Sequence, residues 1–479
     1  MLTTMRMIDH HYINGQFVKS NGTEMQELIN PATKQIIGKV TLGNEKDAQM
    51  AIAAAKEAFI TFSKTTVKER SEMLQRLHDS IMAKVDALTQ AAIEEYGSPF
   101  SGSHGRTVYA AKTCLYAQES LKHFDFVSYV GKTKVILEPL GVIGAITPWN
   151  ANYTHICNKI APAIATGCTI VVKPSELSAI QTQLLMECIA DANLPVGVIN
   201  IINGTGAVVG AEMTRHPDIA KISFTGSTNV GKIISKSAVD TLKRLALELG
   251  GKNPNIILDD ADLSTAIPMA VVIGFSNTGQ ACHAGSRLLV PEHQLDEVKK
   301  RIKEAVASTK IGNPQEKDTV LGPLVSQRQF DTVQRYIQAG LDEGAELVAG
   351  GLGHPDGLEK GFFAKPTVFA HVTSEMTIAR EEIFGPVLSI ISYKTDEEAI
   401  QIANDTIYGL AAYVSSSNLE RARNVASKII AGRVLINKAA HDDPFAPFGG
   451  FKQSGLGRDS GVYGLEEHVE PKAILGYET

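Results

Sequence analysis

The chain has few cysteines, no long apolar run and no sign of a signal peptide. Its five cysteines are odd in number and lack paired spacing, which argues against a disulfide framework and favours a reducing compartment. Apolar runs such as residues 141–146 and 169–172 fall well short of the roughly 18 residues that span a bilayer. Residues 1–13 lack the apolar core of a signal peptide. We therefore expect a cytoplasmic protein without a membrane segment.

Strong charge of one sign is also missing. The net charge is −6 and no run of lysine or arginine occurs, so nothing points to nucleic acid or to an anionic membrane. The histidines do not stand at ligand spacing from Cys, Asp or Glu, so no metal site is expected. At 479 residues, the chain exceeds the roughly 250–300 residues that one hydrophobic core supports, which predicts at least two domains.

Helical and strand patterns alternate along most of the chain. Strands are expected at residues 169–172, 198–202, 219–224 and 246–249, with helices between them. After Gly251 the alternation resumes, so we predict two α/β units with parallel sheets. Asn44 and Thr66 are expected to cap helices. Gly97 is expected to end one long amphipathic helix, whose stripe comprises Leu74, Leu77, Ile81, Val85 and Leu88.

Two segments break the alternation. Residues 132–138 form an alternating strand without a covering helix, and residues 454–479 form a tail with little helical periodicity. Both are expected to be edge elements that need a pairing partner.

Cys282 stands in the segment Asn-Thr-Gly-Gln-Ala-Cys-His-Ala-Gly, residues 277–285. Small residues and amides around it suit an exposed turn, where a thiolate can act as a nucleophile. The alternative is core filling, because free cysteine is often buried. Cys114, Cys168 and Cys188 lie on apolar segments and are expected to fill the core.

Two glycine-containing segments are candidates for phosphate binding. Residues 224–231 follow a strand and open a helix, where backbone N–H groups suit a pyrophosphate. The run of Gly204, Gly206 and Gly210 resembles a dinucleotide fingerprint only loosely, because its spacing differs. Lys173 and Glu176 follow a strand end, where open α/β sheets place ligands.

Further segments combine with these: residues 148–150 (Pro-Trp-Asn), 248–251 (Glu-Leu-Gly-Gly), 382–386 (Glu-Ile-Phe-Gly-Pro) and 447–455. In this order the chain resembles the NAD(P)-dependent aldehyde dehydrogenase superfamily. The resemblance implies a Rossmann-type NAD-binding domain (residues 1–122 and 142–250) and a second α/β, catalytic domain (251–453). It also implies a small β oligomerisation element (123–141 and 454–479), and hence a homodimer or homotetramer.

The resemblance implies oxidation of an aldehyde to its carboxylic acid. Cys282 would be the nucleophile, Asn150 an oxyanion donor, Glu248 the general base that activates water, and Lys159 a supporting residue. Glu248 favours hydrolysis over transfer to coenzyme A. Glu176 would repel a 2′-phosphate, so NAD is expected rather than NADP. The implied cofactor-binding residues are Ile146, Thr147, Pro148, Trp149, Lys173, Ser175, Glu176, Gly206, Gly210, Phe224, Gly226, Ser227, Leu249, Gly250, Glu382 and Phe384.

The chain departs from the family pattern around the expected substrate tunnel, where polar residues replace common aromatics. A polar tunnel would reject long alkyl chains, so a small or polar aldehyde is expected. The alternative is that these side chains turn away to solvent. The expected substrate residues are Ala151, Tyr153, His155, Asn158, Ala281, His283, His441, Asp442 and Phe448.

Two other functions stay open from the sequence. A thiol esterase could use Cys282 and His283 without redox chemistry. A non-catalytic binding protein is disfavoured, because Cys282, Glu248 and Asn150 are all present.

Overall fold

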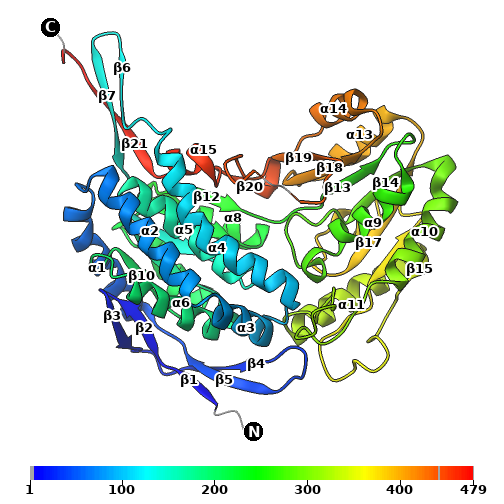
Figure 1. The fold of residues 1–479 in the computed structure, drawn as a ribbon, viewed down its shortest axis with the longest axis horizontal. Coiled ribbons are helices and arrows are strands. Elements are labelled where there is room, and N and C mark those ends of the chain that lie inside the picture. Colours follow the sequence, from blue (N-terminus) through cyan, green and yellow to red (C-terminus); the bar gives the residue numbers. More distant parts are fainter. Residues whose placement is uncertain (1–4, 441–442, 478–479) are drawn as a thin grey trace.

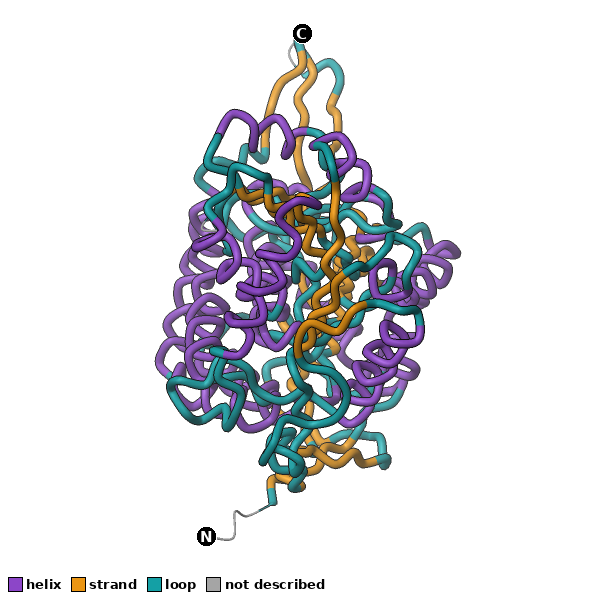
Figure 2. Tube along the Cα trace, turned by 90° about the vertical axis from the view of Figure 1, so that its right-hand side faces the viewer, coloured by secondary structure: helices purple, strands orange, loops and turns teal. Residues whose placement is uncertain are grey.

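The computed structural model describes residues 5–440 and 443–477. The chain forms two α/β units, one at each side of Figure 1, and a narrow β extension near the C-terminal end. From the side, the strands lie between layers of helices, and the extension projects beyond them (Figure 2). The predicted α/β fold class is confirmed.

The first unit is built on an eight-stranded sheet in the order β20-β12-β11-β8-β9-β10-β2-β3. Strands β12, β11, β8, β9 and β10 are parallel, and the strand order reverses between β8 and β11. Such a reversal opens a crevice at the carboxyl ends of the strands. The bounds are β2 His10–Ile13, β3 Gln16–Lys19, β8 Val142–Ile146, β9 Thr169–Lys173, β10 Ile199–Ile201, β11 Ile219–Thr225, β12 Arg244–Glu248 and β20 Gly455–Leu456.

Successive apolar side chains of β9 point to opposite faces of this sheet, so the strand contributes to a hydrophobic core on each face. Ile170 and Val172 join the core under α2 to α6, whereas Val171 joins the core under α1, α7 and α8. One layer consists of α2 (Val67–Ala83), α3 (Val85–Tyr96), α4 (Phe100–Leu121), α5 (Asn152–Thr166) and α6 (Ala179–Asp191). The other consists of α1 (Glu45–Phe62), α7 (Ala211–Arg215) and α8 (Thr228–Ala238).

The helix starts at Asn44 and Thr66 are confirmed, each with a capping box. The single long helix before Gly97 is wrong, because the chain breaks at Lys84 (φ −114°, ψ 16°) between α2 and α3. The apolar stripe still serves one core, which holds Leu74 and Leu88 together. Lys84 Nζ lies 2.9 Å from an oxygen of Asp191 at the end of α6. The ion pair therefore connects the junction of α2 and α3 to the end of α6.

The second unit is built on a seven-stranded sheet in the order β15-β16-β17-β14-β13-β18-β19, antiparallel only at β15. The strands are β13 Pro254–Ile257, β14 Arg287–Pro291, β15 Glu346–Ala349, β16 Thr367–Ala370, β17 Val387–Tyr393, β18 Ala411–Ser415 and β19 Arg433–Ile436. Its main helices are α9 (Leu263–Gly274), α10 (Leu295–Ala307), α11 (Gln327–Asp342), α13 (Asp396–Asn404) and α14 (Leu419–Ser427).

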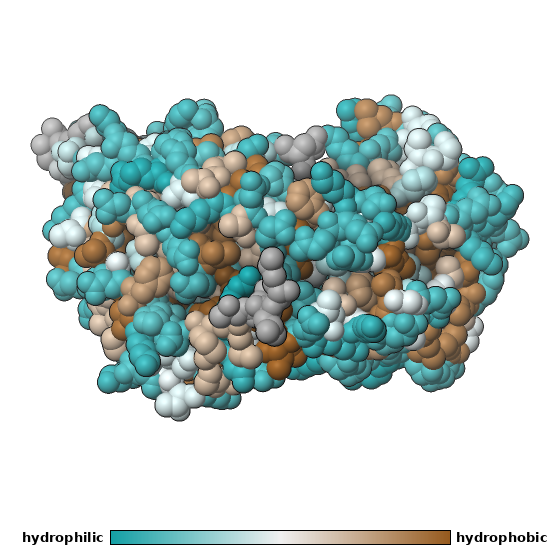
Figure 3. Space-filling model, turned by 60° about the horizontal axis from the view of Figure 1, so that its bottom comes forward, coloured by the Kyte–Doolittle hydropathy of each residue, from teal (hydrophilic) through white to brown (hydrophobic). Residues whose placement is uncertain are grey.

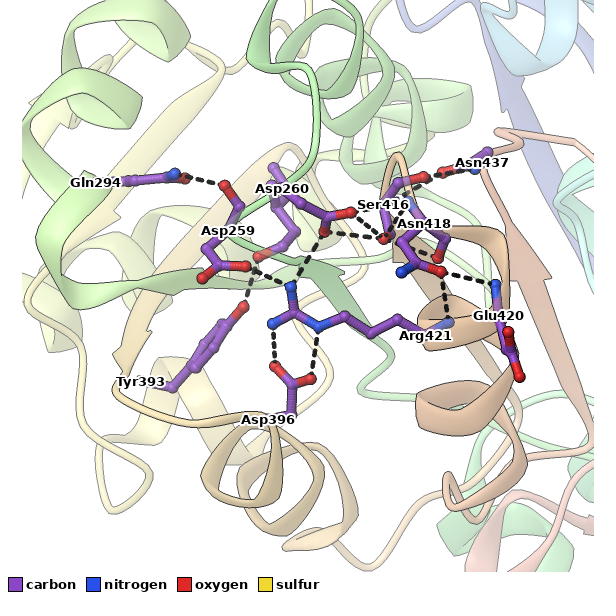
Figure 4. Close-up of polar contacts among 11 residues, drawn as sticks. Asp259, Asp260, Gln294, Tyr393, Asp396, Ser416, Asn418, Glu420, Arg421 and Asn437 are labelled. Carbon is purple, nitrogen blue, oxygen red and sulfur yellow. Dashed lines mark hydrogen bonds and ion pairs between the residues drawn. The ribbon is translucent and has the colours of Figure 1, made fainter.

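One arginine joins the ends of several elements in this second unit (Figure 4). Arg421 on α14 makes two hydrogen bonds of 2.7 and 2.8 Å to Asp396 at the start of α13. It also contacts Asp259 and Asp260, which follow β13. Asp260 in turn accepts hydrogen bonds from Ser416 after β18. The carboxyl ends of β13 and β18 are thereby held to both helices.

The extension gives the strand predicted at residues 132–138 its partners. The strand is β7 (Thr133–Pro139), which pairs with β6 (Val127–Val130) and with β21 (Val469–Ile474) from the tail. The rest of the tail differs from expectation, because β20 joins the first sheet beside β12 and a short helix, α15 (Gly461–Glu466), follows. Six residues are too few to show helical periodicity in the sequence.

The N-terminal strands form a small separate sheet, β1 (Arg6–Ile8), β5 (Ile36–Thr41) and β4 (Met25–Ile29). Hydrophilic side chains dominate the face shown in Figure 3, with apolar ones in small groups between them. Within residues 5–440 and 443–477, no helix has both the length and the apolarity to cross a membrane.

Candidate active site

A cavity of about 230 Å³ lies where the two units meet. It opens at the carboxyl ends of β8, β11 and β12, next to the reversal in strand order, and the second unit contributes its other wall. Twelve residues that the sequence analysis assigned to the site line this cavity, together with Thr225 and Gln329: Pro148, Trp149, Asn150, His155, Gly226, Ser227, Glu248, Leu249, Gly250, Cys282, Glu382 and Phe384. The structure therefore gathers residues that are more than 200 positions apart in the sequence.

Cys282 lies on a turn after α9, and its side chain faces the cavity. The preceding Asn277 and Thr278 have left-handed backbones (φ 54° and 58°), which is uncommon for residues other than glycine. Burial raises the pKa of the Cys282 thiol to about 12, and the carboxylates of Glu382 and Glu248 act in the same direction. The backbone N–H groups of Cys282 and His283 favour the thiolate, but the thiol is protonated at neutral pH in this state.

Asn150 stands between the carboxyl end of β8 and the start of α5. Its side chain is 8% exposed, and Nδ2 donates to the carbonyl of Gln280 at 3.2 Å. That carbonyl lies two residues before Cys282, so the amide is held at the nucleophile turn. An asparagine amide carries two N–H donors, which leaves the second one for an acceptor in the cavity.

Glu248 ends β12 and is 5% exposed. Burial raises its pKa well above the ordinary value, and the nearby Asp459 carboxylate adds to the rise. The charges of Lys159 and Arg458 oppose this rise. Oε2 has no hydrogen-bond partner among the described residues. Burial therefore favours the protonated form of Glu248, and Oε2 is available to a water or substrate.

Lys159 lies behind Glu248. Its ammonium donates to Ser223 Oγ at 2.8 Å, and an oxygen of Asp459 lies 3.9 Å away. The side chain is 2% exposed, so this lysine is fixed by one hydrogen bond and a distant carboxylate. Sequence reasoning missed Asp459, because nothing in its local pattern indicates that it lies near Glu248.

Glu382 forms the wall of the cavity opposite β12. Oε1 accepts a hydrogen bond of 3.1 Å from the Gly251 N–H. Burial raises the pKa of Glu382 to about 7, although this hydrogen bond and Lys252 favour the carboxylate. Gln329 on α11, which sequence reasoning missed, donates to the carbonyls of Ile383 and Phe384 and so fixes the segment.

Trp149 and Phe384 form an aromatic corner of the cavity. Their rings meet edge to face with centroids 5.4 Å apart, and the Tyr96 ring also packs against Trp149, with centroids 5.7 Å apart. Phe384 has a left-handed backbone (φ 57°), a strained conformation that concentrates at functional sites.

Other residues expected to bind the cofactor lie along the same strand ends but outside the cavity. Lys173 Nζ lies 3.1 Å from an oxygen of Glu176, and Ser175 Oγ accepts from the Leu177 N–H. Ile146 and Phe224 are buried in the core, and Gly210 packs against Ile146. A Cβ on Gly206 would meet nothing within 4 Å, so this glycine lies beside open space.

The strand-end groups fit a dinucleotide. The buried hydroxyls of Thr147 and Thr225 have no hydrogen-bond partner among the described residues. Gly226 precedes Ser227, which caps α8 by accepting from the Val230 N–H at 3.3 Å. The cap and helix start offer backbone N–H groups to an anion. Buried donors and acceptors that lack partners are satisfied when a polar ligand is bound.

The expected substrate residues are dispersed. His155 lines the cavity, and burial, assisted by the charges of Lys159 and His283, lowers its pKa to about 3, so it is neutral. Tyr153 instead lies in the core and donates to the Leu88 carbonyl at 2.9 Å. His283 has an exposed side chain, Ala281 is buried, and Ala151 has a left-handed backbone (φ 56°) at the start of α5.

Two of the remaining substrate candidates, Asn158 on α5 and Phe448, lie outside the lining of the cavity around Cys282. Asn158 lines a separate small cavity together with Tyr109, Tyr116 and Pro444. Phe448 packs beneath the guanidinium of Arg433, whose Cζ is 4.9 Å from the ring centroid. His441 and Asp442 lie outside the described residues. The aromatics on α4 were missed, because their helix was not assigned from the sequence.

The sequence profile of the aldehyde dehydrogenase family matches residues 17–474. The chain belongs to the aldehyde dehydrogenase family. Members of the family oxidise aldehydes to acids. The chain is 48% identical over 476 residues to a 3-succinoylsemialdehyde-pyridine dehydrogenase from a Pseudomonas species, covering 99% of this chain and 100% of that protein.

Solved structures of the family superpose closely on this fold. A mutant of aldehyde dehydrogenase C from Pseudomonas syringae, solved with NAD+ and octanal, is 44% identical, with a TM-score of 0.97 and coverage of 100% of this chain and 99% of that one. Betaine aldehyde dehydrogenase from Staphylococcus aureus, solved with NAD+, is 37% identical, with a TM-score of 0.94 and coverage of 97% and 94%.

Proposed function

We propose that this aldehyde dehydrogenase uses NAD and releases a free carboxylic acid by hydrolysis of a thioester on Cys282. The observation that carries the proposal is the convergence of Cys282, Asn150, Glu248 and Glu382 on one cavity. A nucleophile, an amide donor, a buried base and a second carboxylate are the groups that this reaction needs.

The cofactor would lie along the strand ends next to the cavity. Glu382 would accept from ribose hydroxyls near the nicotinamide, and the start of α8 at Gly226 and Ser227 would face the pyrophosphate. Lys173 and Glu176 would bind the adenosine ribose, where a carboxylate disfavours the 2′-phosphate of NADP. When bound, the dinucleotide supplies the acceptor for the hydride that leaves the substrate.

In the first half-reaction, Cys282 Sγ bonds to the aldehyde carbon. The thiol proton would pass first to the Glu248 carboxylate, which lies close enough for its charge to affect the thiol pKa, and from there to solvent before the second half-reaction. The aldehyde oxygen becomes an oxyanion, which accepts from Asn150 Nδ2 and from the Cys282 N–H. Loss of hydride from the former aldehyde carbon leaves a thioester on Sγ.

In the second half-reaction, Glu248 takes a proton from a water molecule, whose oxygen attacks the thioester carbon. The C–S bond then breaks, which releases the acid and returns Cys282. Lys159 and Asp459 lie behind Glu248 and influence its charge in opposite directions. We assign to Lys159 the role of setting how readily Glu248 gives up its proton.

We infer that the substrate is small or polar. The neutral imidazole of His155 lines the cavity, and a long alkyl chain would leave it without a partner. The comparison of kcat/KM for hexanal and glyceraldehyde tests this inference. A strong preference for hexanal would contradict it.

We also propose the domain division expected from the sequence and a homodimer or homotetramer. The extension exposes apolar side chains that a second copy would cover: Val127, Tyr129, Val130, Leu475 and Tyr477. Light scattering of the purified protein, with Tyr129→Ser as the test variant, measures the oligomeric state.

The function is tested by NADH absorbance with a panel of aldehydes. We expect NADH with NAD, much less product with NADP, and none with Cys282→Ala. Identification of the free acid in the absence of coenzyme A tests the hydrolytic step. Hydrolysis of esters without any NADH formation would indicate a thiol esterase instead.

A further inference from the structure

Arg433 on β19 lies on the same side of the second sheet as the nucleophile turn. It pairs in register with Ala411, and the next residue on its face, Leu435, pairs with Tyr413. Ala411, Tyr413 and Leu435 belong to one apolar cluster, so this face is continuous. The Tyr413 hydroxyl donates to the His283 carbonyl at 2.9 Å, directly after Cys282.

The guanidinium of Arg433 is only partly used by the protein. Nε donates to the Pro447 carbonyl at 2.8 Å and Nη2 to the Ala446 carbonyl at 2.6 Å. The group also lies over the Phe448 ring. Nη1 is buried and has no hydrogen-bond partner among the described residues. Since a guanidinium is always charged, an unpaired buried donor on it is costly unless an acceptor is supplied.

Two sets of contacts place Arg433 between the active site and the small cavity lined by Asn158. Its acceptor carbonyls at residues 446 and 447 closely follow Pro444, which lines the small cavity, and Tyr413 on the same sheet face bonds to the His283 carbonyl beside Cys282. Burial lowers the Arg433 pKa, and the nearby Tyr109, Glu248 and Asp443 side chains oppose this effect. Tyr109 lines the small cavity with Asn158 and Pro444. Glu248 belongs to the other side, and burial raises its pKa, which favours its neutral form. This shift weakens the competition of Glu248 with a substrate carboxylate for the Arg433 cation.

We propose that Arg433 selects aldehydes that carry a carboxylate at the end remote from the carbonyl, by donating its Nη1–H to that carboxylate. This inference rests on the proposed function and names its substrate class. A carboxylate is the acceptor that a guanidinium binds most strongly. The Asp443 carboxylate lies near enough to favour the charged form of Arg433, but it makes no hydrogen bond to Nη1; its Oδ1 accepts from the Phe445 N–H at 2.9 Å.

The test compares aldehydes of matched length with and without the carboxylate: 4-oxobutanoate against pentanal, and 5-oxopentanoate against hexanal. We expect the wild-type enzyme to favour at least one oxo acid over its partner by about tenfold or more in kcat/KM. Arg433→Gln should lower kcat/KM for that oxo acid by about 10–100-fold, mainly through KM. The value for the matched alkanal should change by less than about threefold.

Two further variants separate recognition from structure. Arg433→Lys keeps a positive charge and should retain part of the preference, whereas Arg423→Gln, at an exposed position on α14, should retain all of it. Equal loss with both substrates in Arg433→Gln would overturn the proposal, because it would show that Arg433 only holds residues 446–448 in place. If Arg433→Gln does not fold, the ratio of kcat/KM for the oxo acid to that for the matched alkanal is compared between the wild-type enzyme and Arg433→Lys. An unchanged ratio in Arg433→Lys would then contradict the proposal.

Absence of any preference for the oxo acids in the wild-type enzyme would also overturn the inference while leaving the proposed function intact. Failure to form NADH from any aldehyde would instead overturn the proposed function, and this inference with it. The wild-type rates therefore distinguish the two failures.

Discussion

The Glu382 carboxylate lies directly against the backbone of Gly250. A Cβ on Gly250 would stand 2.1 Å from Glu382 Oε2, and the next residue, Gly251, donates its N–H to Oε1 of the same carboxylate. Glu382 of the second unit is thus held against the turn that follows Glu248 in the first unit. Only a residue without a side chain permits this approach.

Gly250→Ala should therefore weaken NAD binding, because the added methyl group must displace Glu382 from the cavity. We expect a rise in the dissociation constant of at least about tenfold, measured by fluorescence titration of Trp149. Gly105→Ala is the matched control, since a Cβ there meets nothing within 4 Å and alanine favours helix. Unchanged NAD affinity in Gly250→Ala would contradict this account of Glu382.

The state of the Cys282 thiol predicts slow alkylation of the cofactor-free enzyme. Burial and then the charges of Glu382 and Glu248 raise its pKa to about 12, so the thiolate fraction is small at neutral pH and grows as pH rises. The rate of carbamidomethylation by iodoacetamide, followed by mass spectrometry, should still be increasing at pH 9. A plateau near pH 7 would show that the resting thiol is already ionised.

Asn150→Ala should slow the chemical step and spare cofactor binding. Loss of one oxyanion donor typically costs on the order of 10²–10³ in rate. Stopped-flow measurement of NADH formation gives that rate, and titration with NAD gives the affinity. Because Asn150 also bonds to the Gln280 carbonyl, a parallel loss of NAD affinity would mean that the amide mainly shapes the turn.

Glu248→Gln should separate the two half-reactions. With the base removed, hydrolysis slows and acylated Cys282 should accumulate, which intact-protein mass spectrometry detects. In the wild-type enzyme, burial raises the Glu248 pKa, so the carboxylate needed for hydrolysis appears as pH rises. We expect kcat to increase with pH through that raised pKa and this dependence to vanish in Glu248→Gln. Fast release of acid by the variant would exclude Glu248 as the base.

The ion-pair network around Arg421 predicts a stability effect away from the cavity. Arg421→Leu leaves Asp259, Asp260 and Asp396 without their shared cation, so the apparent melting temperature should fall by a few degrees. Arg423→Leu, at an exposed position two residues further on the same helix, should have little effect. Equal melting temperatures for both variants would show that the network adds no stability.

Periodicity predicted most of the strands and the two-unit α/β fold, because buried parallel strands are short continuous apolar runs. It failed at Lys84, where apolar spacing continues across a break that only the backbone angles reveal. Periodicity also missed that the tail contributes to two sheets, β20 to the first sheet and β21 to the extension. A strand of two residues, such as β20, is too short to show alternation.

The family resemblance selected the residues that meet at the cavity, including Cys282 and Glu382, although no local pattern connects them. Residues that act by distant contact were not found: Gln329 fixes the segment of Glu382 by two hydrogen bonds, and Asp459 faces Lys159. Tyr153 is a wrong prediction of the other kind, a residue that was assigned to the site but lies elsewhere. Its place three residues after Asn150 suggested the substrate tunnel, whereas its ring turns into the core.

The pairing of β20 with β12 has a consequence for how the chain matures. Leu456 and Gly455 cover the edge of the strand that ends in Glu248, yet they leave the ribosome after every residue that lines the cavity. Until then β12 has an unpaired edge in the first sheet, next to Glu248. A nascent chain therefore completes the sheet beside Glu248 only after residues 455–456 have been synthesised.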